Sequence, residues 1–352
     1  MRLAKVRDIL TEKELDAILI SQPENRRYLS AFTGSAGMLL ISVDRAVLAT
    51  DFRYFEQVAR ESPGFELAKI TGKFSEAFSD LVSDIGMKRL GFESQHVTVD
   101  QLQEWTRATN GVEWVPLKSA VEALRAVKDA GEVEALRRSA ALTDAAFAHL
   151  LQVIEPGMTE RGAAWEIEAY MRANGASKVA FDLIVGAGPN GALPHARPGD
   201  HAIKLGEPIV VDIGCVLDGY CSDLTRTFCL GQATPKYLQV WDTVLQAQEA
   251  AEAAISAGME GTAAHAVAHD LIAQAGYGEF FGHGLGHGVG LAVHEKPSAS
   301  RLSEDTLEAG MSLTVEPGIY LPGEFGVRIE DLVIVGQDGV EILSTAPKAP
   351  VL

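Results

Sequence analysis

The chain contains 352 residues, of which 47% are hydrophobic, and it has a formal net charge of −18. This apolar content is too high for a disordered chain, and the glycines and prolines follow no repeat that would indicate collagen. An acidic chain repels phosphate unless its basic residues gather on one face. The sequence contains no such basic cluster, so we do not expect a nucleic-acid partner. At roughly 150 residues per domain, the length favours two domains.

The sequence also carries few signals for export or membrane insertion. Charged residues run through the first twenty positions, so we do not expect a secretory signal there. No stretch approaches the roughly 18 apolar residues of a membrane helix, and we expect no membrane partner. Neither the number nor the spacing of Cys215, Cys221 and Cys229 indicates a disulfide framework or a zinc knuckle. These features favour a cytoplasmic protein.

Predicted helices and strands alternate over the first part of the chain. Apolar periodicity predicts helices over residues 4–13, 54–60 and 74–85 and strands over residues 17–20, 38–41 and 46–49. Such alternation is typical of an α/β layer domain, which we place at residues 1–124.

A different pattern begins after this domain. Residues 129–154 are rich in Ala, Leu, Glu and Arg at helical spacing, and Pro156-Gly157 ends the predicted helix. Helices then alternate with short hairpins to the end of the chain. This pattern indicates an α+β domain, which we place at residues 125–352.

The second domain contains an internal repeat. Each half runs through two helices, a glycine-rich stretch with histidine, and a hairpin with two carboxylates. The first half has helices over 129–154 and 160–174, His195 and a hairpin over 209–228; the second has helices over 237–255 and 262–275, the histidine segment 281–295 and a hairpin over 313–333. The repeat predicts a pseudo-two-fold domain with a site at its axis. The alternative is a chance resemblance between two helix–hairpin units.

The first hairpin carries Asp212 and Asp223. Asp218-Gly219 is turn chemistry, and a turn centred between Leu217 and Asp218 would place the two acids directly opposite each other. Like charges in that position are destabilising unless something neutralises them. Asp212 also follows an apolar run, where an uncompensated carboxylate is costly.

The second hairpin repeats this arrangement. A turn centred at Gly323 would place Glu316 opposite Glu330, with Arg328 on the same face as Glu330. The alternative for all four acids is a solvated surface, the usual location of Asp and Glu. Acids embedded in Val, Ile and Leu runs disfavour that alternative.

The histidine segment has glycine at every even position from 282 to 290. An extended backbone would then present one face without side chains and a second face with His283 and His287. Histidine combined with carboxylates suits a divalent metal such as manganese, cobalt, zinc or iron. Four acids and one or two imidazoles suit two cations roughly 3.5–4 Å apart. The alternative is that these histidines are packed or hydrogen-bonded without a metal.

A glycine motif before His195 suggests a different class of protein, a dinucleotide-binding oxidoreductase. Residues 186–191 match the G-x-G-x-x-G fingerprint of dinucleotide-binding folds, and the acid Asp212 follows about twenty residues later. That fingerprint requires a helix to follow, but Pro194 and Pro198 prevent one. An oxidoreductase is therefore disfavoured.

Taken together, these residues resemble the pita-bread metallopeptidases, a family that includes methionine aminopeptidase, aminopeptidase P and prolidase. The matching motifs are Asp212 followed eleven residues later by Asp223, Gly-His287-Gly-Val-Gly-Leu, Glu316-Pro-Gly, and Arg328-Ile-Glu330-Asp. The resemblance covers the whole chain. It implies an α+β fold in which a pita-bread catalytic domain follows a smaller α/β creatinase-like N-terminal domain.

The resemblance also implies two divalent metal ions per subunit, with manganese preferred and cobalt or zinc as alternatives. Asp212 would bind one ion, His287 and Glu316 would bind the other, and Asp223 and Glu330 would bridge both.

Further roles follow from the same resemblance. His195, His283 and His294 would contact the substrate and stabilise the tetrahedral intermediate, and Arg328 would contribute to substrate binding. Glu316 would move the proton of the attacking water. Which histidine protonates the leaving nitrogen stays open.

The subfamily depends on smaller features. Residues 25–35 and 50–57 are similar to aminopeptidase P, and creatinase, which shares the fold, lacks the metal ligands that this chain keeps. Prolidases of this size often carry an arginine four residues after the histidine of Val-His-Glu, to bind a dipeptide's carboxylate. This chain has Ser298 there, although Arg301 or an arginine of the first domain could substitute.

We therefore predict an Xaa-Pro aminopeptidase that acts on proline-containing peptides, with Xaa-Pro dipeptidase as the close alternative. Methionine aminopeptidase-like activity and a non-catalytic peptide-binding module are the remaining alternatives. The resemblance further implies a homodimer.

Overall fold

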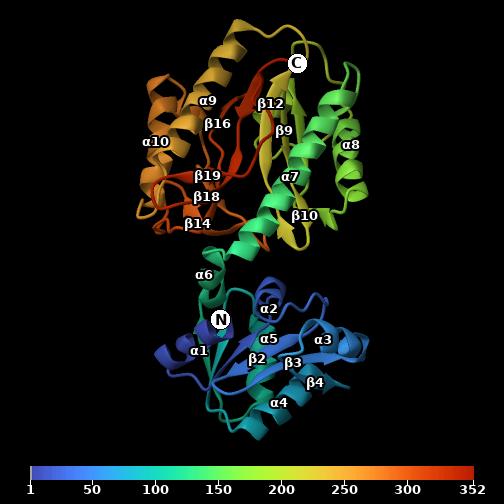
Figure 1. The fold of residues 1–352 in the computed structure, drawn as a ribbon, viewed down its shortest axis with the longest axis vertical. Helices are drawn as coiled ribbons and strands as arrows, with labels where there is room; N and C mark the ends of the chain where they lie inside the picture. Colours follow the sequence, from blue (N-terminus) through green and yellow to red (C-terminus); the bar gives the residue numbers. More distant parts are fainter. Residues whose placement is uncertain (1) are drawn as a thin grey trace. The chain divides into compact units, whose positions relative to one another are not determined.

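The computed structural model describes residues 2–352, apart from the side chain of Ile85. The chain divides into two compact units, Met1–Arg125 and Ala126–Leu352, and each has its own hydrophobic core. Figure 1 shows the first unit in blue to teal and the second in green to red. No helix within residues 2–352 is long and apolar enough to cross a membrane.

The N-terminal unit is built on a six-stranded mixed sheet in the order β4-β3-β2-β1-β5-β6. The strands are β1 (Ala17–Ile20), β2 (Met38–Ser42), β3 (Ala46–Asp51), β4 (Glu66–Ile70), β5 (Arg89–Glu93) and β6 (Glu113–Leu117). The helices are α1 (Arg2–Glu12), α2 (Pro23–Ser30), α3 (Phe55–Glu61), α4 (Phe74–Ile85), α5 (Val99–Ala108) and α6 (Ala120–Ala126), with a 3₁₀ turn, η1 (Phe52–Tyr54). The predicted α/β layer is confirmed.

The C-terminal unit combines four long helices with short strands. The helices are α7 (Ala130–Val153), α8 (Glu160–Ala173), α9 (Pro235–Ala254) and α10 (Gly261–Gln274), with 3₁₀ turns η2 (Gly188–Ala192) and η3 (Gly278–Phe280). The strands of the first half are β7 (Lys178–Val179), β8 (Ile184–Ala187), β9 (Pro208–Ile213), β10 (Cys215–Leu217), β11 (Tyr220–Cys221) and β12 (Leu224–Cys229). Those of the second half are β13 (Gly286–Gly288), β14 (Glu295–Ala299), β15 (Ser312–Val315), β16 (Gly318–Leu321), β17 (Phe325–Arg328), β18 (Asp331–Val335) and β19 (Val340–Ile342).

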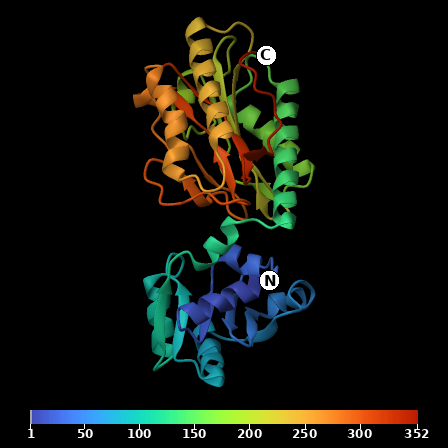
Figure 2. The same cartoon turned by 60° about the vertical axis from the view of Figure 1, so that its left-hand side comes forward.

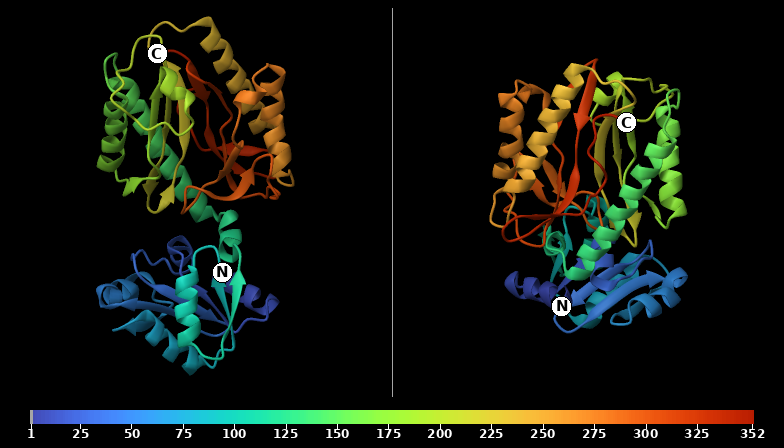
Figure 3. Two further views of the ribbon diagram at one scale, coloured as in Figure 1. Left: turned by 180° about the vertical axis from the view of Figure 1, so that it is seen from behind. Right: turned by 45° about the horizontal axis from the view of Figure 1, so that its top comes forward.

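Two helix pairs flank these strands. Helix α7 packs on α8 and α9 packs on α10, and Figures 2 and 3 show the green pair and the gold-to-orange pair on opposite sides of the strands. The chain therefore passes twice through helix, helix and strands, which agrees with the predicted internal repeat and with the α+β class.

Local capping explains where the helices begin. Asp129 and Glu132 form a capping box that starts α7, and Thr159 accepts a hydrogen bond from Gly162 N at the start of α8. In the second half Thr234 caps α9, with Pro235 at the first helical position. The helix starts expected from the sequence agree with these positions to within two residues.

Candidate functional site

The first carboxylate hairpin has a different register from the one predicted. Asp212 on β9 lies opposite Thr225 on β12, so the expected direct opposition of Asp212 and Asp223 is wrong. The cause is the turn: Asp218 and Gly219 both have positive φ (51° and 86°) and form its two central residues, one position later than predicted. A two-residue hairpin turn of this type requires positive φ at both positions.

The shifted register still brings the acids together. Asp223 lies two residues from Thr225, so its side chain faces the same side of the hairpin as Asp212, on the diagonal. One carboxylate oxygen from each of Asp212, Asp223 and Glu330 lies within 4.8 Å of the other two. Asp223 is 6% exposed and Glu330 is 1% exposed, so these charges are shielded from water.

The second hairpin has the predicted register. Val315 pairs with Asp331 and Gly318 pairs with Arg328, which places Glu316 and Glu330 across from each other in the gap between the two ladders. Pro317 cannot donate a ladder hydrogen bond, which accounts for the interruption.

Because the ladder is interrupted, both glutamates pair with other segments. Glu330 N donates to Thr225 O and Glu316 N donates to Leu285 O. The side chains are also fixed, since Thr225 Oγ1 donates to Glu330 Oε2 at 2.7 Å and Thr314 Oγ1 donates to Glu316 Oε1 at 3.0 Å. These bonds join the two hairpins and the histidine segment at one point.

His287 completes the cluster. Its Nε2 lies 3.5 Å from Glu316 Oε1 and 3.8 Å from Asp223 Oδ2. Its Nδ1 lies 3.1 Å from Gly288 O, a contact that favours a proton on Nδ1 and leaves the Nε2 lone pair directed at the acids. The glycine beside it is required by packing, because a Cβ on Gly286 would lie 1.8 Å from Thr314 O. The extended conformation predicted for the whole segment is limited to β13.

The other predicted histidines lie around the same cavity. His283 Nε2 contacts Tyr320 Oη at 2.9 Å, and the His294 ring centre lies 4.3 Å from that of His287. His195 lines the cavity wall. Burial lowers the pKa of His287 and His294, and it lowers the pKa of His283 to about 4. These three imidazoles are therefore neutral at pH 7.

Arg328 is the cation closest to the acids. Its Nη2 donates to Asp212 Oδ2 at 2.5 Å, its Nη1 donates to Tyr320 Oη at 2.6 Å, and its Nε donates to Thr225 Oγ1 at 3.1 Å. Arg328 is 3% exposed, and its contacts with Tyr320 and Thr225 are buried, whereas that with Asp212 is partly buried. One arginine cannot balance four carboxylates.

The electrostatics confirm this imbalance. Burial and neighbouring carboxylates raise the pKa of Asp223 and of Glu330 well above their ordinary values, and burial raises the pKa of Glu316 to about 7. Asp212 Oδ1 is buried and has no hydrogen-bond partner among the described residues. A buried carboxylate oxygen without a partner, inside a set of Asp, Glu and His donors, fits a divalent cation.

These residues surround a single cavity of about 1050 Å³. Its walls come from the two carboxylate hairpins, the histidine segment, and the loop that carries His195. Its lining includes Phe181, Pro194, Arg197, Phe280, Val293, Ser298, Tyr320 and Pro322 in addition to the predicted site residues.

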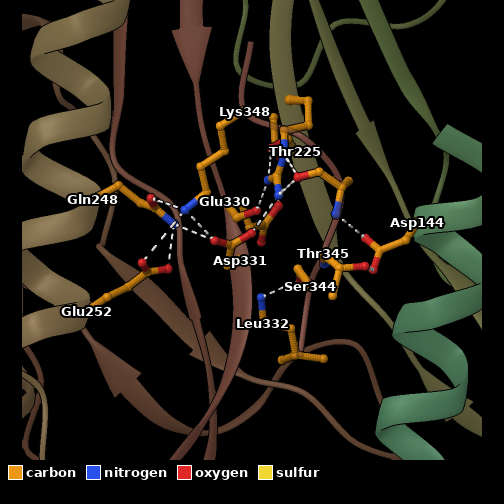
Figure 4. Close-up of polar contacts among 12 residues, drawn as sticks. Asp144, Thr225, Gln248, Glu252, Glu330, Asp331, Leu332, Ser344, Thr345 and Lys348 are labelled. Atoms are coloured by element: carbon orange, nitrogen blue, oxygen red, sulfur yellow. Dashed lines mark hydrogen bonds and ion pairs between the residues drawn. The ribbon is translucent and has the colours of Figure 1, made fainter. Parts of the chain in front are cut away.

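A buried polar network supports the cluster from behind (Figure 4). Glu330 and Asp331 are consecutive and face opposite sides. Asp331 accepts hydrogen bonds from Arg226 Nη2 at 2.7 Å and forms an ion pair with Lys348 Nζ at 2.6 Å, and Arg226 Nη1 also donates to Glu330 O. The backbone of Glu330 is thereby held from the side away from the cavity.

Among the cavity residues that the sequence analysis missed, Tyr320 and Arg197 carry polar groups suited to a role in the site. Tyr320, which links His283 to Arg328, has the same strand parity as Glu316, and that parity could have identified it. Arg197 lies two residues after His195 and between two prolines, a spacing that could have placed both side chains on one face.

Comparison with known proteins identifies the family. A model of metallopeptidase family M24 matches residues 134–337, and a model of the creatinase/prolidase N-terminal domain matches residues 2–127. The chain belongs to metallopeptidase family M24. The resemblance to pita-bread metallopeptidases predicted from the sequence is confirmed.

Individual relatives match this M24 peptidase over almost its whole length. The Xaa-Pro dipeptidase of Pyrococcus furiosus is 33% identical, with 97% of each chain covered. The structure of an Xaa-Pro dipeptidase from Bacillus anthracis has a TM-score of 0.97 at 39% identity and covers 100% of this chain and 99% of its own. That of an X-Pro aminopeptidase from Thermotoga maritima has a TM-score of 0.93 at 37% identity and covers 100% of both chains. The protein is thus a metallo-exopeptidase, and its family implies divalent metals.

Proposed function

We propose that this M24 peptidase is an Xaa-Pro dipeptidase, which hydrolyses the bond between the first residue and proline in dipeptides. The observation that carries the proposal is the convergence of Asp212, Asp223, Glu330, Glu316 and His287 at one end of a cavity lined by histidines. Similarity to dipeptidases from two organisms supports the dipeptide specificity. The sequence favoured the aminopeptidase, and these relatives shift the preference.

The ligand assignment is part of the proposal. Asp212 would hold one cation, His287 and Glu316 the other, and Asp223 and Glu330 would be shared. The distances among these groups support this division, since Asp223 lies near both Asp212 and His287. When bound, two such cations lower the pKa of a water molecule and polarise the substrate carbonyl.

The chain's own residues would then handle protons and orientation. Glu316 lies beside His287 in the cavity wall, where its carboxylate would accept a proton from the attacking water and pass it on. His294 is neutral at pH 7 and can donate its N–H to the developing oxyanion without carrying a charge of its own. His195 lines the cavity and would share this role.

His283 donates its one N–H, on Nδ1, to Gly284 O, so its Nε2 accepts from Tyr320 Oη and would orient that hydroxyl in the cavity. Arg328 orients Asp212 and Tyr320 and would act on the substrate through them.

The second candidate is an Xaa-Pro aminopeptidase that accepts longer peptides. Two observations favour it: Ser298 stands in the cavity wall where many prolidases carry an arginine, and the X-Pro aminopeptidase of Thermotoga maritima is a structural neighbour. Both candidates use the same metal ligands and differ only in what binds the end of the substrate.

A cleavage panel tests the proposal. Xaa-Pro, Xaa-Pro-Xaa and Met-Ala-Xaa peptides are incubated with the protein loaded with manganese, cobalt or zinc in turn. We expect hydrolysis of Xaa-Pro and little of the other two. Cleavage of Xaa-Pro-Xaa ahead of Xaa-Pro would support the aminopeptidase, and cleavage of Met-Ala-Xaa would support a methionine aminopeptidase.

Metal analysis and two variants separate an enzyme from a binding module. We expect about two divalent ions per chain and loss of hydrolysis in Glu316→Gln and in His287→Ala, both as soluble, folded proteins. A protein without stoichiometric metal and without activity after manganese or cobalt addition would be a non-catalytic peptide-binding module. The homodimer implied by resemblance is checked by light scattering.

A further inference from the structure

The cavity carries an excess of acidic side chains. Its lining includes Asp182, Asp212, Asp223, Glu279, Glu316 and Glu330, but within the described part of the chain only two arginines and no lysine. The four acids among the proposed metal ligands would be offset by the cations that they hold, which leaves the arginines of the lining as the side chains that can receive the free carboxylate of a dipeptide.

The two arginines differ in what they can offer. Arg328 is buried and donates to Asp212, Tyr320 and Thr225, so its guanidinium is already committed. Arg197 is exposed in the cavity wall and makes no hydrogen bond or ion pair with any residue that the structure describes. An arginine with its donors free can bind a carboxylate through two parallel hydrogen bonds.

The loop that carries Arg197 is fixed. Glu160, at the start of α8, is 0% exposed and accepts hydrogen bonds from Ala187 N at 2.9 Å, Asn190 Nδ2 at 2.9 Å and Gly199 N at 3.0 Å. One buried carboxylate therefore ties both ends of the segment 187–199. A loop ordered before the substrate arrives loses less entropy on binding.

The tip of the same loop faces the cavity. Ala196 N donates to Leu193 O, which closes a turn, and Ala196 is 5% exposed between the exposed side chains of His195 and Arg197. Arg328 Nη1 reaches Pro194 O at 3.4 Å and so connects the turn to the acid cluster. His195 and Arg197 are thus presented together in the cavity wall.

Other positions offer no equivalent cation. Ser298 lines the cavity, but its Oγ donates to Ser300 Oγ at 3.3 Å and carries no charge. Arg301, which the sequence suggested as a substitute, is not part of the cavity lining.

We propose that Arg197 binds the free C-terminal carboxylate of the substrate and thereby makes the enzyme selective for dipeptides. The inference rests on the proposed Xaa-Pro dipeptidase function and adds the residue that reads the end of the substrate. The ligand class is a dipeptide with an ionised carboxylate, and its C-terminal amide is the matched compound that lacks the recognised charge.

Steady-state kinetics of the manganese-loaded enzyme test this residue. The variants are Arg197→Ala, Arg197→Lys and the control Arg161→Ala, which removes an exposed arginine that pairs with Asp200 beside the loop. The substrates are an Xaa-Pro dipeptide and its amide. We expect Arg197→Ala to lower kcat/KM for the dipeptide about 10- to 100-fold, mainly through KM, and to change the amide less than about twofold. Arg197→Lys should keep part of the preference for the dipeptide over its amide, and Arg161→Ala should have the wild-type kcat/KM on both substrates.

Three outcomes overturn the inference. An equal loss on both substrates would indicate a general effect on the loop, and no loss on the dipeptide would mean that another group binds the carboxylate. A selective loss in Arg301→Ala, with Arg197→Ala unchanged, would transfer the role to Arg301.

Binding measurements keep this test separate from the proposed function. If the wild-type enzyme cleaves neither substrate, the function fails, and the inference is decided by calorimetry with two analogues in which a methylene replaces the scissile carbonyl. One analogue ends in a carboxylate and the other in a carboxamide. We expect wild-type protein to prefer the carboxylate form about 10- to 100-fold and Arg197→Ala to bind both alike. Equal binding of both analogues by the wild type would refute the role of Arg197.

Discussion

Arg328 Nη2 donates to Asp212 Oδ2 at 2.5 Å within the cluster of four carboxylates. The arginine belongs to β17 and the aspartate to β9, so the contact joins the two halves of the internal repeat. Because His287 is neutral and Arg328 is the arginine that contacts these acids among the described residues, Arg328 supplies the positive charge that holds them together before any metal binds.

Replacing Arg328 with Met should therefore destabilise the metal-free protein. Removing one partner of a buried ion pair leaves an uncompensated charge and typically costs about 3–5 kcal/mol. Urea unfolding after chelation measures the free energy of unfolding. We expect manganese to recover part of the loss, since cations neutralise the same acids, and Arg328→Lys to lose less than Arg328→Met. Unchanged stability of Arg328→Met would show that the pair contributes nothing.

Removing the charge of Asp223 should stabilise the metal-free protein, in contrast to the replacement of Arg328. Burial and the Glu330 carboxylate raise its pKa well above the ordinary value, so its ionised form weakens the metal-free fold. We expect Asp223→Asn to stabilise the metal-free protein by about 1–3 kcal/mol at pH 7.5 and to lower manganese affinity at least about tenfold.

Urea unfolding and calorimetric titration with manganese measure these two effects. The matched control is Asp218→Asn, the same change at an exposed turn position of the same hairpin, where Asn also tolerates positive φ. Asp218→Asn should change neither the free energy of unfolding nor the manganese affinity. A destabilised metal-free Asp223→Asn protein would contradict the view that charge repulsion dominates the cluster.

The network behind the cluster predicts a pH effect at Glu252. Burial and the Asp331 carboxylate raise the pKa of Glu252 to about 8, despite Lys348 Nζ at 3.7 Å. The ordinary pKa is near 4.5, so the stabilising contribution of the neutral form is complete below that pH and is lost as the pH rises through about 8. Glu252→Gln keeps an acceptor for Gln248 Nε2 and removes this loss.

We therefore expect the stability advantage of Glu252→Gln over the wild type to grow by about 1–3 kcal/mol between pH 5 and pH 8. Urea unfolding at four pH values measures it. Glu249→Gln, on the exposed face of the same helix, is the control and should show no such trend. A constant difference across this range would mean that Glu252 is already ionised at pH 5 in the folded protein.

The sequence predicted the correct strand register for the second carboxylate hairpin but not for the first, because their turns differ. The turn at Gly323 has a single residue with positive φ, and centring on it gave the correct register for Glu316 and Glu330. The first turn uses positive φ at both Asp218 and Gly219, and only the turn type fixes its centre. The predicted pairing of Asp212 was therefore shifted, although period-2 alternation kept the acids on one face.

Other features depend on tertiary pairing and could not be predicted locally. The approach of Glu330 to β12 rests on the hydrogen bond from Glu330 N to Thr225 O, between segments more than one hundred positions apart. In the N-terminal unit, β5 has Arg, Gly and Glu within five residues, so its apolar signal was too weak to identify it. Arg197 was missed because its spacing from His195 indicates a substrate contact only once the cavity beside the loop is known.

Glu160 provides a final test of how the loop works. Its two oxygens accept hydrogen bonds from both ends of the segment 187–199, which carries His195 as well as Arg197. In Glu160→Gln one oxygen becomes an amide N–H₂, which cannot accept from Gly199 N, and an unsatisfied buried donor costs about 1–3 kcal/mol. We expect kcat/KM to fall about tenfold for the dipeptide and for its amide alike, because both cavity residues are displaced together.

This pattern differs from that of Arg197→Ala, which should affect the dipeptide alone. Glu168→Gln is the matched control, since Glu168 lies on the same helix and pairs with Arg172 at the surface. Steady-state kinetics on both substrates, with unfolding measured in parallel, separate the two cases. If Glu160→Gln lowered kcat/KM for the dipeptide alone, His195 would keep its position without the Glu160 carboxylate. Glu160 would then position Arg197 only.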